Sequence, residues 1–279
     1  MSYIIVIDSC GEMTEEMKKD PRFISAPLSM QVDEYDIVDD ATFDQADFLK
    51  KVAASPNSPK SACPSPEFYK TAYEGEADHI YAVTLSAELS GSYNSAQLGK
   101  ALFQEENPDK KIYIFNSKSA SIGETLIALK IQECEEAGMP FDTLVETVEA
   151  YIAEQNTWFV LESLETLRKN GRLSNLKALA ASVLKIKPVM MATPEGNIAQ
   201  LDQARGINKA LVKMVSSIAE ITEHPENKIL AISHCNCRDR AMLVKEALME
   251  KMKLKDIFVL DTAGISSMYA NDGGIIVVV

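Results

Sequence analysis

Two kinds of hydrophobic pattern alternate along this chain. Largely apolar runs occur at Tyr3–Ile7, Ile80–Leu85 and Lys111–Asn116, and such runs are typical of parallel strands that are covered on both faces. Elsewhere, apolar residues from Phe141 to about Asn156 recur at helical spacing, which predicts an amphipathic helix. This alternation predicts an α/β fold whose first part is a Rossmann-like lobe built on a parallel sheet.

The rest of the chain predicts a second α/β lobe. Apolar runs predict strands at 158–161, 188–192, 198–201, 228–233 and 256–260 and in the final G-G-I-I-V-V-V. Helical spacing and helix-terminating residues predict helices at about 163–169, 175–185, 207–221 and 238–251. The turn residues of 194–197 predict a hairpin between two of the strands. We therefore expect lobes at 1–156 and 157–279.

Length, charge and cysteine content narrow the classes of protein. A chain of 279 residues is near the size at which single cores divide, so two lobes are favoured. The formal net charge of −13 repels nucleic acid and anionic membranes, and we expect neither as a partner. The five dispersed cysteines favour reduced thiols in the cytoplasm. The N-terminus lacks a basic region and no apolar segment could span a bilayer, so we expect no signal peptide and no stable membrane insertion.

A candidate anion site follows the apolar run at 80–85. Small and hydroxylated residues come next, and Ser90 occupies the position expected for a helix N-cap. Gly91 and Ser92 place little bulk over the first free backbone N–H groups of that helix. These donors, the helix dipole and the Ser90 hydroxyl together predict a site for a small anion.

Other segments could contribute to this site. The proline-rich sequence at 55–66 predicts an extended loop, which is either a surface connector or a route that brings Ser61 to the anion. Asp8 and Ser9 end the first predicted strand, at the sheet edge where ligands of open α/β sheets collect. Arg172 follows a helix-terminating Asn-Gly pair, and it could pair with the anion or with a structural carboxylate.

Several other chemistries find little support. The sequence around Ser90, L-S-G-S-Y, is not the G-x-S-x-G elbow of a serine hydrolase. His234, Cys235 and Cys237 could supply three metal ligands, but a structural zinc site needs a fourth, and no second Cys/His pair is present. The chain contains neither a P-loop nor G-x-G-x-x-G. We therefore predict no metal site, no nucleotide cofactor and no catalytic residue.

Seven short motifs in register resemble the DegV family and together cover nearly the whole chain. They are I-D-S at 7–9, K-S-A-C-P-S-P at 60–66, L-S-G-S-Y-N-S-A at 89–96, N-S-K-S-A-S-I-G at 116–123, L-R-K-N-G-R-L at 167–173, A-R-G at 204–206 and Y-A-N-D-G-G-I at 269–275. The resemblance implies one DegV-type domain over about 3–278. It also implies a parallel sheet in the first lobe, a mixed sheet in the second, and a long-chain fatty acid bound between them.

The resemblance also implies a role and a set of site residues. Characterised members of the family serve as the fatty-acid-binding subunit of a bacterial fatty acid kinase and present the carboxylate to a separate kinase, which binds ATP. On the matching motifs, Ser61 and Ser90 are the carboxylate ligands. Their motifs also place three neighbours at the fatty acid: Ala62, which replaces a serine common in the family, together with Cys63 and Gly91. Near the head group the resemblance places Ser9, Arg172 and Met268, the last where many members carry a histidine.

The leading hypothesis is therefore a cytoplasmic protein that binds a fatty acid such as palmitate or oleate, for presentation to a kinase or for lipid transport. Two other functions remain open. One is an enzyme acting on a small carboxylated or phosphorylated metabolite at the Ser90 helix, and the other is a sensor whose ligand drives association with a partner. Pocket shape distinguishes the first two, because a lipid needs a deep apolar space and a metabolite needs a shallow polar one.

Overall fold

The structure is a computed structural model and describes residues 2–173 and 185–279. Its first sheet, sheet A, has four parallel strands, in the order β2 (Phe23–Ala26), β1 (Tyr3–Asp8), β6 (His79–Thr84) and β7 (Lys111–Asn116). The short helix α1 (Glu15–Lys19) connects β1 to β2. The three apolar runs of the first lobe thus form adjacent parallel strands, as predicted.

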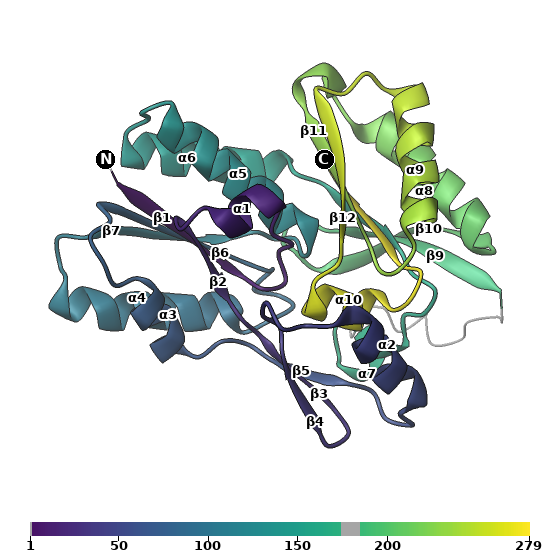
Figure 1. The fold of residues 1–279 in the computed structure, drawn as a ribbon. Helices are drawn as coiled ribbons and strands as arrows, with labels where there is room; N and C mark the ends of the chain where they lie inside the picture. Colours follow the sequence, from purple (N-terminus) through teal and green to yellow (C-terminus); the bar gives the residue numbers. More distant parts are fainter. Residues whose placement is uncertain (1, 174–184) are drawn as a thin grey trace.

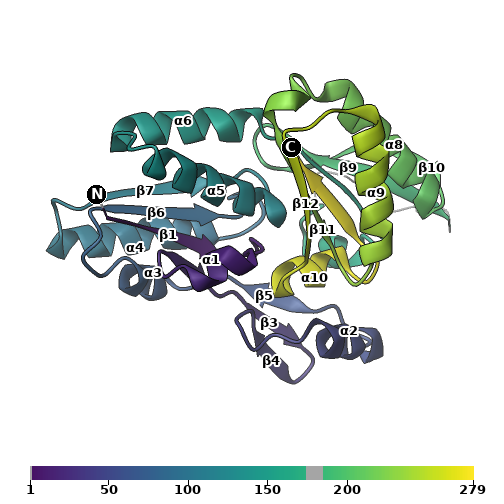
Figure 2. The same cartoon turned by 45° about the horizontal axis from the view of Figure 1, so that its top comes forward.

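Helices cover both faces of sheet A (Figures 1 and 2). On one face lie α5 (Ile122–Glu136) and α6 (Phe141–Glu154), and on the other lie α3 (Pro66–Ala72) and α4 (Ser92–Glu106). Side chains alternate between the two, since Ile5 and Tyr81 pack with α5 and α6, whereas Val6 and Ala82 pack with α3 and α4. Burial on both faces explains why these strands are apolar without interruption.

Sheet B is a small antiparallel sheet that the sequence did not predict. Its order is β4 (Tyr35–Val38), β3 (Ser29–Val32) and β5 (Lys60–Ala62), and α2 (Gln45–Ala54) connects β4 to β5. The proline-rich segment expected as a loop therefore contains a strand, in which Ser61 pairs with Met30 of β3. Strands of three and four residues are too short for a two-residue period to stand out.

Sheet C is the mixed sheet of the second half of the chain. Its order is β10 (Ile198–Arg205), β9 (Ile186–Ala192), β8 (Thr157–Val160), β13 (Ile275–Val278), β11 (Ile229–His234) and β12 (Asp256–Asp261). Only β11 and β12 are parallel to each other among its neighbouring pairs in the described residues. The hairpin predicted around 194–197 connects β9 to β10. The helix predicted at 175–185 falls almost entirely outside the described residues.

Helices lie on both sides of sheet C. The helices α8 (Ile207–Ile221) and α9 (Arg238–Lys251) pack on one face, while α7 (Glu165–Lys169) and α10 (Gly264–Ala270) lie on the side of the first lobe (Figure 1). A short 3₁₀ turn, Pro225–Asn227, precedes β11. None of the described helices combines the length and apolar composition needed to cross a membrane.

The strands of the two halves do not mix. All strands of sheets A and B precede residue 117, and all strands of sheet C follow residue 156. We keep the proposed division at 156/157 and refer to residues 2–156 as the first lobe and the described residues from 157 on as the second. The face of sheet C that carries Phe159 and Ile276 turns toward the first lobe, so a site between the lobes has one wall from each.

Candidate functional site

The turn between β6 and α4 differs in one detail from the prediction. Helix α4 begins at Ser92, so Gly91 rather than Ser90 is the N-cap, and it makes no side-chain capping bond. The Ser90 hydroxyl instead accepts a hydrogen bond from the Ser92 backbone N–H, at 3.2 Å, and lies 3.1 Å from the Ser92 hydroxyl. Serine commonly bonds the backbone two residues onward in this way. Ser90 therefore still lies against the N-terminus of α4, one residue earlier than expected.

The Ser61 motif and the Ser90 motif come together in space. The Sγ atom of Cys63 lies 3.6 Å from the Ser95 hydroxyl of α4. It is also the atom nearest to a side chain added at Gly91, at 3.2 Å from an ideal Cβ. A larger residue at 91 would press on Cys63, so the glycine allows β5 to approach the start of α4. These contacts favour the interpretation in which the proline-rich segment reaches the start of α4 over the interpretation of a surface connector.

Tyr269 of α10 joins Ser61 to Arg172. The Ser61 and Tyr269 hydroxyl oxygens are 3.0 Å apart, and the Arg172 guanidinium carbon lies 5.8 Å from the centre of the Tyr269 ring, within the range of a cation–π contact. The Nε atom of Arg172 donates to the Leu89 carbonyl at 3.1 Å, and Nη1 donates to the carbonyl of Asn170. No carboxylate among the described residues forms an ion pair with Arg172. Within the described residues, Arg172 therefore does not form the structural ion pair that was considered as an alternative.

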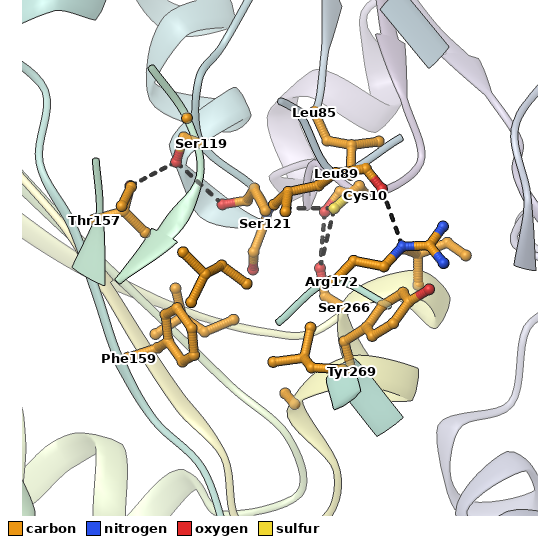
Figure 3. A pocket seen from close by; sticks show the side chains of 18 of the residues that line it. Cys10, Leu85, Leu89, Ser119, Ser121, Thr157, Phe159, Arg172, Ser266 and Tyr269 are labelled. Atoms are coloured by element: carbon orange, nitrogen blue, oxygen red, sulfur yellow. Dashed lines mark hydrogen bonds between the residues drawn. The ribbon is translucent and has the colours of Figure 1, made fainter. Parts of the chain in front are cut away.

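Behind these side chains lies a cavity of about 100 Å³ between the two lobes (Figure 3). This is several times the roughly 10–15 Å³ that one water requires, so it is more than a packing defect. Both lobes supply its apolar wall, which includes Leu85, Leu89, Ile265, Phe159, Leu161 and Ile276. Two cationic residues, Lys118 and Arg172, also line it.

The hydroxyl groups in the cavity wall already have partners within the protein. Ser119 lies 2.6 Å from the Thr157 hydroxyl, Ser121 donates to the Glu12 carboxylate at 2.9 Å, and Ser266 donates to the Cys10 carbonyl at 2.9 Å. Some of these contacts are visible in Figure 3. Because these hydroxyl groups already form hydrogen bonds within the protein, the wall makes mainly hydrophobic contact with a bound molecule. This is the apolar space that distinguishes a lipid site from a shallow metabolite site.

Some of the site residues named from the sequence lie in or beside the cavity wall, and others do not. Arg172 lines the cavity, and Ser61, Ala62, Cys63, Ser90 and Gly91 lie beside its Leu89 and Tyr269 end, outside the wall itself. Ser9 and Met268 do not line the cavity. The Ser9 hydroxyl donates to Asp39 and accepts from the Leu28 N–H, and Asp39 in turn accepts from two N–H groups that begin α10. Ser9 therefore supports that helix.

Met268 lies in the core beside the cavity and is not part of its wall. It is 1% exposed and packs with Leu28 and Met30, whereas Ser266, Tyr269 and Ala270 face the cavity. Tyr269 is the site residue that sequence reasoning missed. The available signal was the motif Y-A-N-D-G-G-I, of which Tyr269 is the first residue, but one residue of error along a helix moves a side chain by about 100°.

Comparison with known proteins identifies the family. A family model described as "Uncharacterised protein, DegV family" matches residues 2–279. This chain belongs to the DegV family. A DegV domain-containing protein of Streptococcus pneumoniae (strain ATCC BAA-255 / R6) is 35% identical over 254 residues, which cover 91% of this chain and 89% of the relative. The resemblance drawn from the motifs is thereby confirmed.

Solved structures of other DegV proteins confirm the fold and show what those proteins bind. A DegV family protein from Ruminococcus gnavus ATCC 29149, solved with vaccenic acid, is 54% identical, with a TM-score of 0.97 and coverage of 100% of this chain and 99% of that one. The fatty acid kinase B3 protein of Streptococcus pneumoniae, loaded with linoleic acid, is 32% identical, with a TM-score of 0.91 and coverage of 100% and 99%.

A buried acidic cluster lies directly behind the cavity wall of this DegV protein. Atoms of Asp8, Cys10 and Glu124 lie within 4.8 Å of one another, and Cys10 also lines the cavity. Asp8 accepts backbone N–H groups from Leu85 and Cys10, whereas neither carboxylate oxygen of Glu124 has a partner among the described residues. Burial raises the pKa of Asp8 to about 6 and that of Glu12 to about 7.

The Glu124 carboxyl group is fully buried. Complete burial raises its pKa well above the usual range, and the neighbouring Asp8 charge raises it further. Burial likewise raises the pKa of the Cys10 thiol, which keeps that thiol protonated and unreactive. The metal ligands considered around His234 are not brought together. Among the described residues, only the cluster of Asp8, Cys10 and Glu124 gathers three possible ligand atoms.

Proposed function

We propose that this DegV protein binds one long-chain fatty acid, such as palmitate or oleate, between its lobes. The carboxylate lies at Ser61 and Ser90, and the acyl chain extends into the space between the lobes behind Tyr269, where the cavity of about 100 Å³ widens to hold it. The observation that carries the proposal is the apolar cavity between the lobes, whose hydroxyl groups are already satisfied and whose one end adjoins the Ser61 and Arg172 side chains. The relatives solved with vaccenic and linoleic acids support it.

The acyl tail and the head group contribute different amounts to the binding free energy. At about 0.8 kcal/mol per buried CH₂, roughly fifteen methylene groups contribute about 12 kcal/mol before the losses of association. A hydrogen bond to a charged group contributes about 1.5–3 kcal/mol. The tail therefore sets most of the affinity, while the hydroxyl groups and the guanidinium fix which end of the fatty acid faces out.

Local charge makes the carboxylate end possible in an acidic protein. The chain carries a net charge of −13, which by itself repels an anion. The N-terminus of α4 directs free N–H groups and a partial positive charge toward Ser90. Arg172 adds a full positive charge and is held beside the same turn by its bond to the Leu89 carbonyl.

We further propose that the bound fatty acid is presented to a separate kinase or carried between sites in the cytoplasm. The likeness to a fatty acid kinase B3 protein supports presentation, and the five free cysteines support a reducing compartment. In this proposal the chain contributes no catalytic residue and no cofactor, because the partner supplies ATP and transfers the phosphoryl group.

Mass spectrometry of an organic extract of the purified native protein tests the binding proposal. We expect about one equivalent of a long-chain fatty acid per chain. Absence of any acyl chain, together with no uptake of oleate or palmitate by the delipidated protein, would overturn it in favour of the small carboxylated or phosphorylated metabolite. For presentation, pull-down with the loaded protein should retain a kinase that the delipidated protein does not retain. Equal retention by both would contradict presentation.

A further inference from the structure

Tyr269 connects the two polar groups at one end of the cavity. Its hydroxyl lies 3.0 Å from the Ser61 hydroxyl, which is its one hydrogen-bond partner in the part of the chain that the structure describes. Its ring lies under the Arg172 guanidinium and also lines the cavity, as Figure 3 shows. A single side chain of α10 thus contacts a strand of sheet B and the segment that follows α7.

We propose that Tyr269 is the positioning residue for the fatty-acid head group. Its hydroxyl donates to Ser61 and so directs the Ser61 proton toward the carboxylate, and its ring holds Arg172 beside the same carboxylate. The inference rests on the proposed function and deepens it, because it explains how the site selects a carboxylate over a neutral head group.

Hydrogen-bond chemistry sets the direction of this chain of contacts. A phenol is a stronger acid than an aliphatic alcohol, so Tyr269 is the better donor of the pair and Ser61 the better acceptor. A serine oxygen that accepts from Tyr269 keeps its own O–H for a third group. Bonds arranged in such a chain polarise and strengthen one another. A carboxylate, which only accepts, is the group that completes this arrangement.

Arg172 is placed in the same way. Its Nε and Nη1 atoms donate to backbone carbonyls, and within the described residues Nη2 keeps both of its N–H groups available. The contact with Tyr269 and these two bonds hold the guanidinium plane in one orientation, which matters because its donors form a rigid fork. Tyr269 thereby orders a hydroxyl donor and a cation with one side chain.

The decisive experiment compares oleate with its neutral methyl ester in four proteins: wild type, Tyr269→Phe, Ser61→Ala and the double variant. We expect Tyr269→Phe to weaken oleate binding about five- to tenfold, the size of one lost hydrogen bond, and methyl oleate binding by less than about twofold. In the Ser61→Ala background, Tyr269→Phe should cost little more, because the two residues act as a unit. Tyr113→Phe is the matched control, since its half-buried hydroxyl bonds Glu149 alone among the residues that the structure describes, away from the cavity.

Each outcome decides between the inference and the proposed function. Equal losses for oleate and its ester, or the same loss with and without Ser61, would show that Tyr269 merely supports the fold and would overturn the inference. Should Tyr269→Phe behave like Tyr113→Phe while Ser61→Ala still weakens oleate, the inference fails and the proposed function stands. If wild type takes up neither ligand, both fail. Melting temperatures of all variants separate affinity changes from unfolding.

Discussion

The Nε atom of Arg172 donates a hydrogen bond to the backbone carbonyl of Leu89, 3.1 Å away. This bond joins the second lobe to the first at the residue that precedes Ser90. It also places a guanidinium at the end of an apolar cavity, beside the N-terminus of α4. A cation and a helix N-terminus therefore lie together at one end of the cavity.

Arg172→Lys should weaken oleate binding about tenfold, because an ammonium cannot reproduce the fork that bonds Leu89 and still faces a carboxylate. Isothermal titration calorimetry at constant pH measures the change. Arg168→Lys is the control, since Arg168 lies on the preceding helix and pairs with Glu165 at the surface. Equal affinities of the two variants would remove Arg172 from the site.

Ser90→Ala should reduce affinity for the fatty acid more than it reduces stability. Ser90 does not cap α4 through its side chain in the usual position, so the loss of stability should stay below about 1 kcal/mol. Ser65→Ala provides the opposite case, because the Ser65 hydroxyl caps α3 by accepting from the Phe68 N–H. We expect urea unfolding to show the larger loss for Ser65→Ala and calorimetry to show the larger loss for Ser90→Ala. The reverse order would make Ser90 a structural residue only.

Ala120→Phe should shorten the space available to the acyl chain. Ala120 lines the cavity, and displacing even two methylene groups at about 0.8 kcal/mol each lowers affinity for oleate more than about tenfold. Ala101→Phe, on an exposed position of α4, makes the same substitution away from the cavity. Fluorescence displacement by fatty acids of increasing length measures the effect. Unchanged affinity of Ala120→Phe for oleate would place the chain elsewhere.

Glu124→Gln should flatten the dependence of stability on pH. The pKa values of Glu124, Asp8 and Glu12 are raised by burial, to about 6 for Asp8 and about 7 for Glu12. Groups with a raised pKa in the folded state contribute their full stability below the unfolded pKa and lose it as the pH rises through the folded pKa. The wild-type protein should therefore lose stability between about pH 4 and 7, and further where Glu124 deprotonates.

In the Glu124→Gln variant the side chain at position 124 has no acidic proton to lose, so stability should decline less as the pH rises. Urea unfolding at several pH values from 5 to 9 measures it, on delipidated protein so that ligand ionisation does not contribute. Glu105→Gln on an exposed position of α4 is the control for the change of charge. A decline as steep in Glu124→Gln as in wild type would show that the cluster does not hold that proton.

The sequence predicted the elements whose residues carry a uniform physical signal. Strands such as β6 and β7 are buried on both faces, which makes them apolar throughout and visible without a structure. The junction between β6 and α4 was predicted for the same reason, since hydroxylated residues follow the strand abruptly at Ser90. The predicted N-cap was wrong by one residue, because both serine and glycine are favourable at that position.

The rest depends on contacts between distant segments. Nothing in the pattern of residues 29–62 distinguishes sheet B from a loop, because its strands are short and partly exposed. The cavity wall could not be predicted for a related reason. Phe159 and Leu161 line it from one face of sheet C, while Val160 between them packs into the core on the other face, and all three are apolar. Tyr269 and Met268 are neighbours on α10, and only the packing of that helix decides that Tyr269 faces the site.

The most direct test of the account is a calorimetric series in which delipidated wild-type protein binds saturated fatty acids of increasing length. We predict one site per chain and an affinity that rises several-fold with each added CH₂, by about 0.8 kcal/mol, until the cavity is full. A short carboxylate such as butyrate that bound as tightly as palmitate would contradict the account, because it would show that the hydroxyl groups and Arg172, and not the cavity, determine what this protein binds.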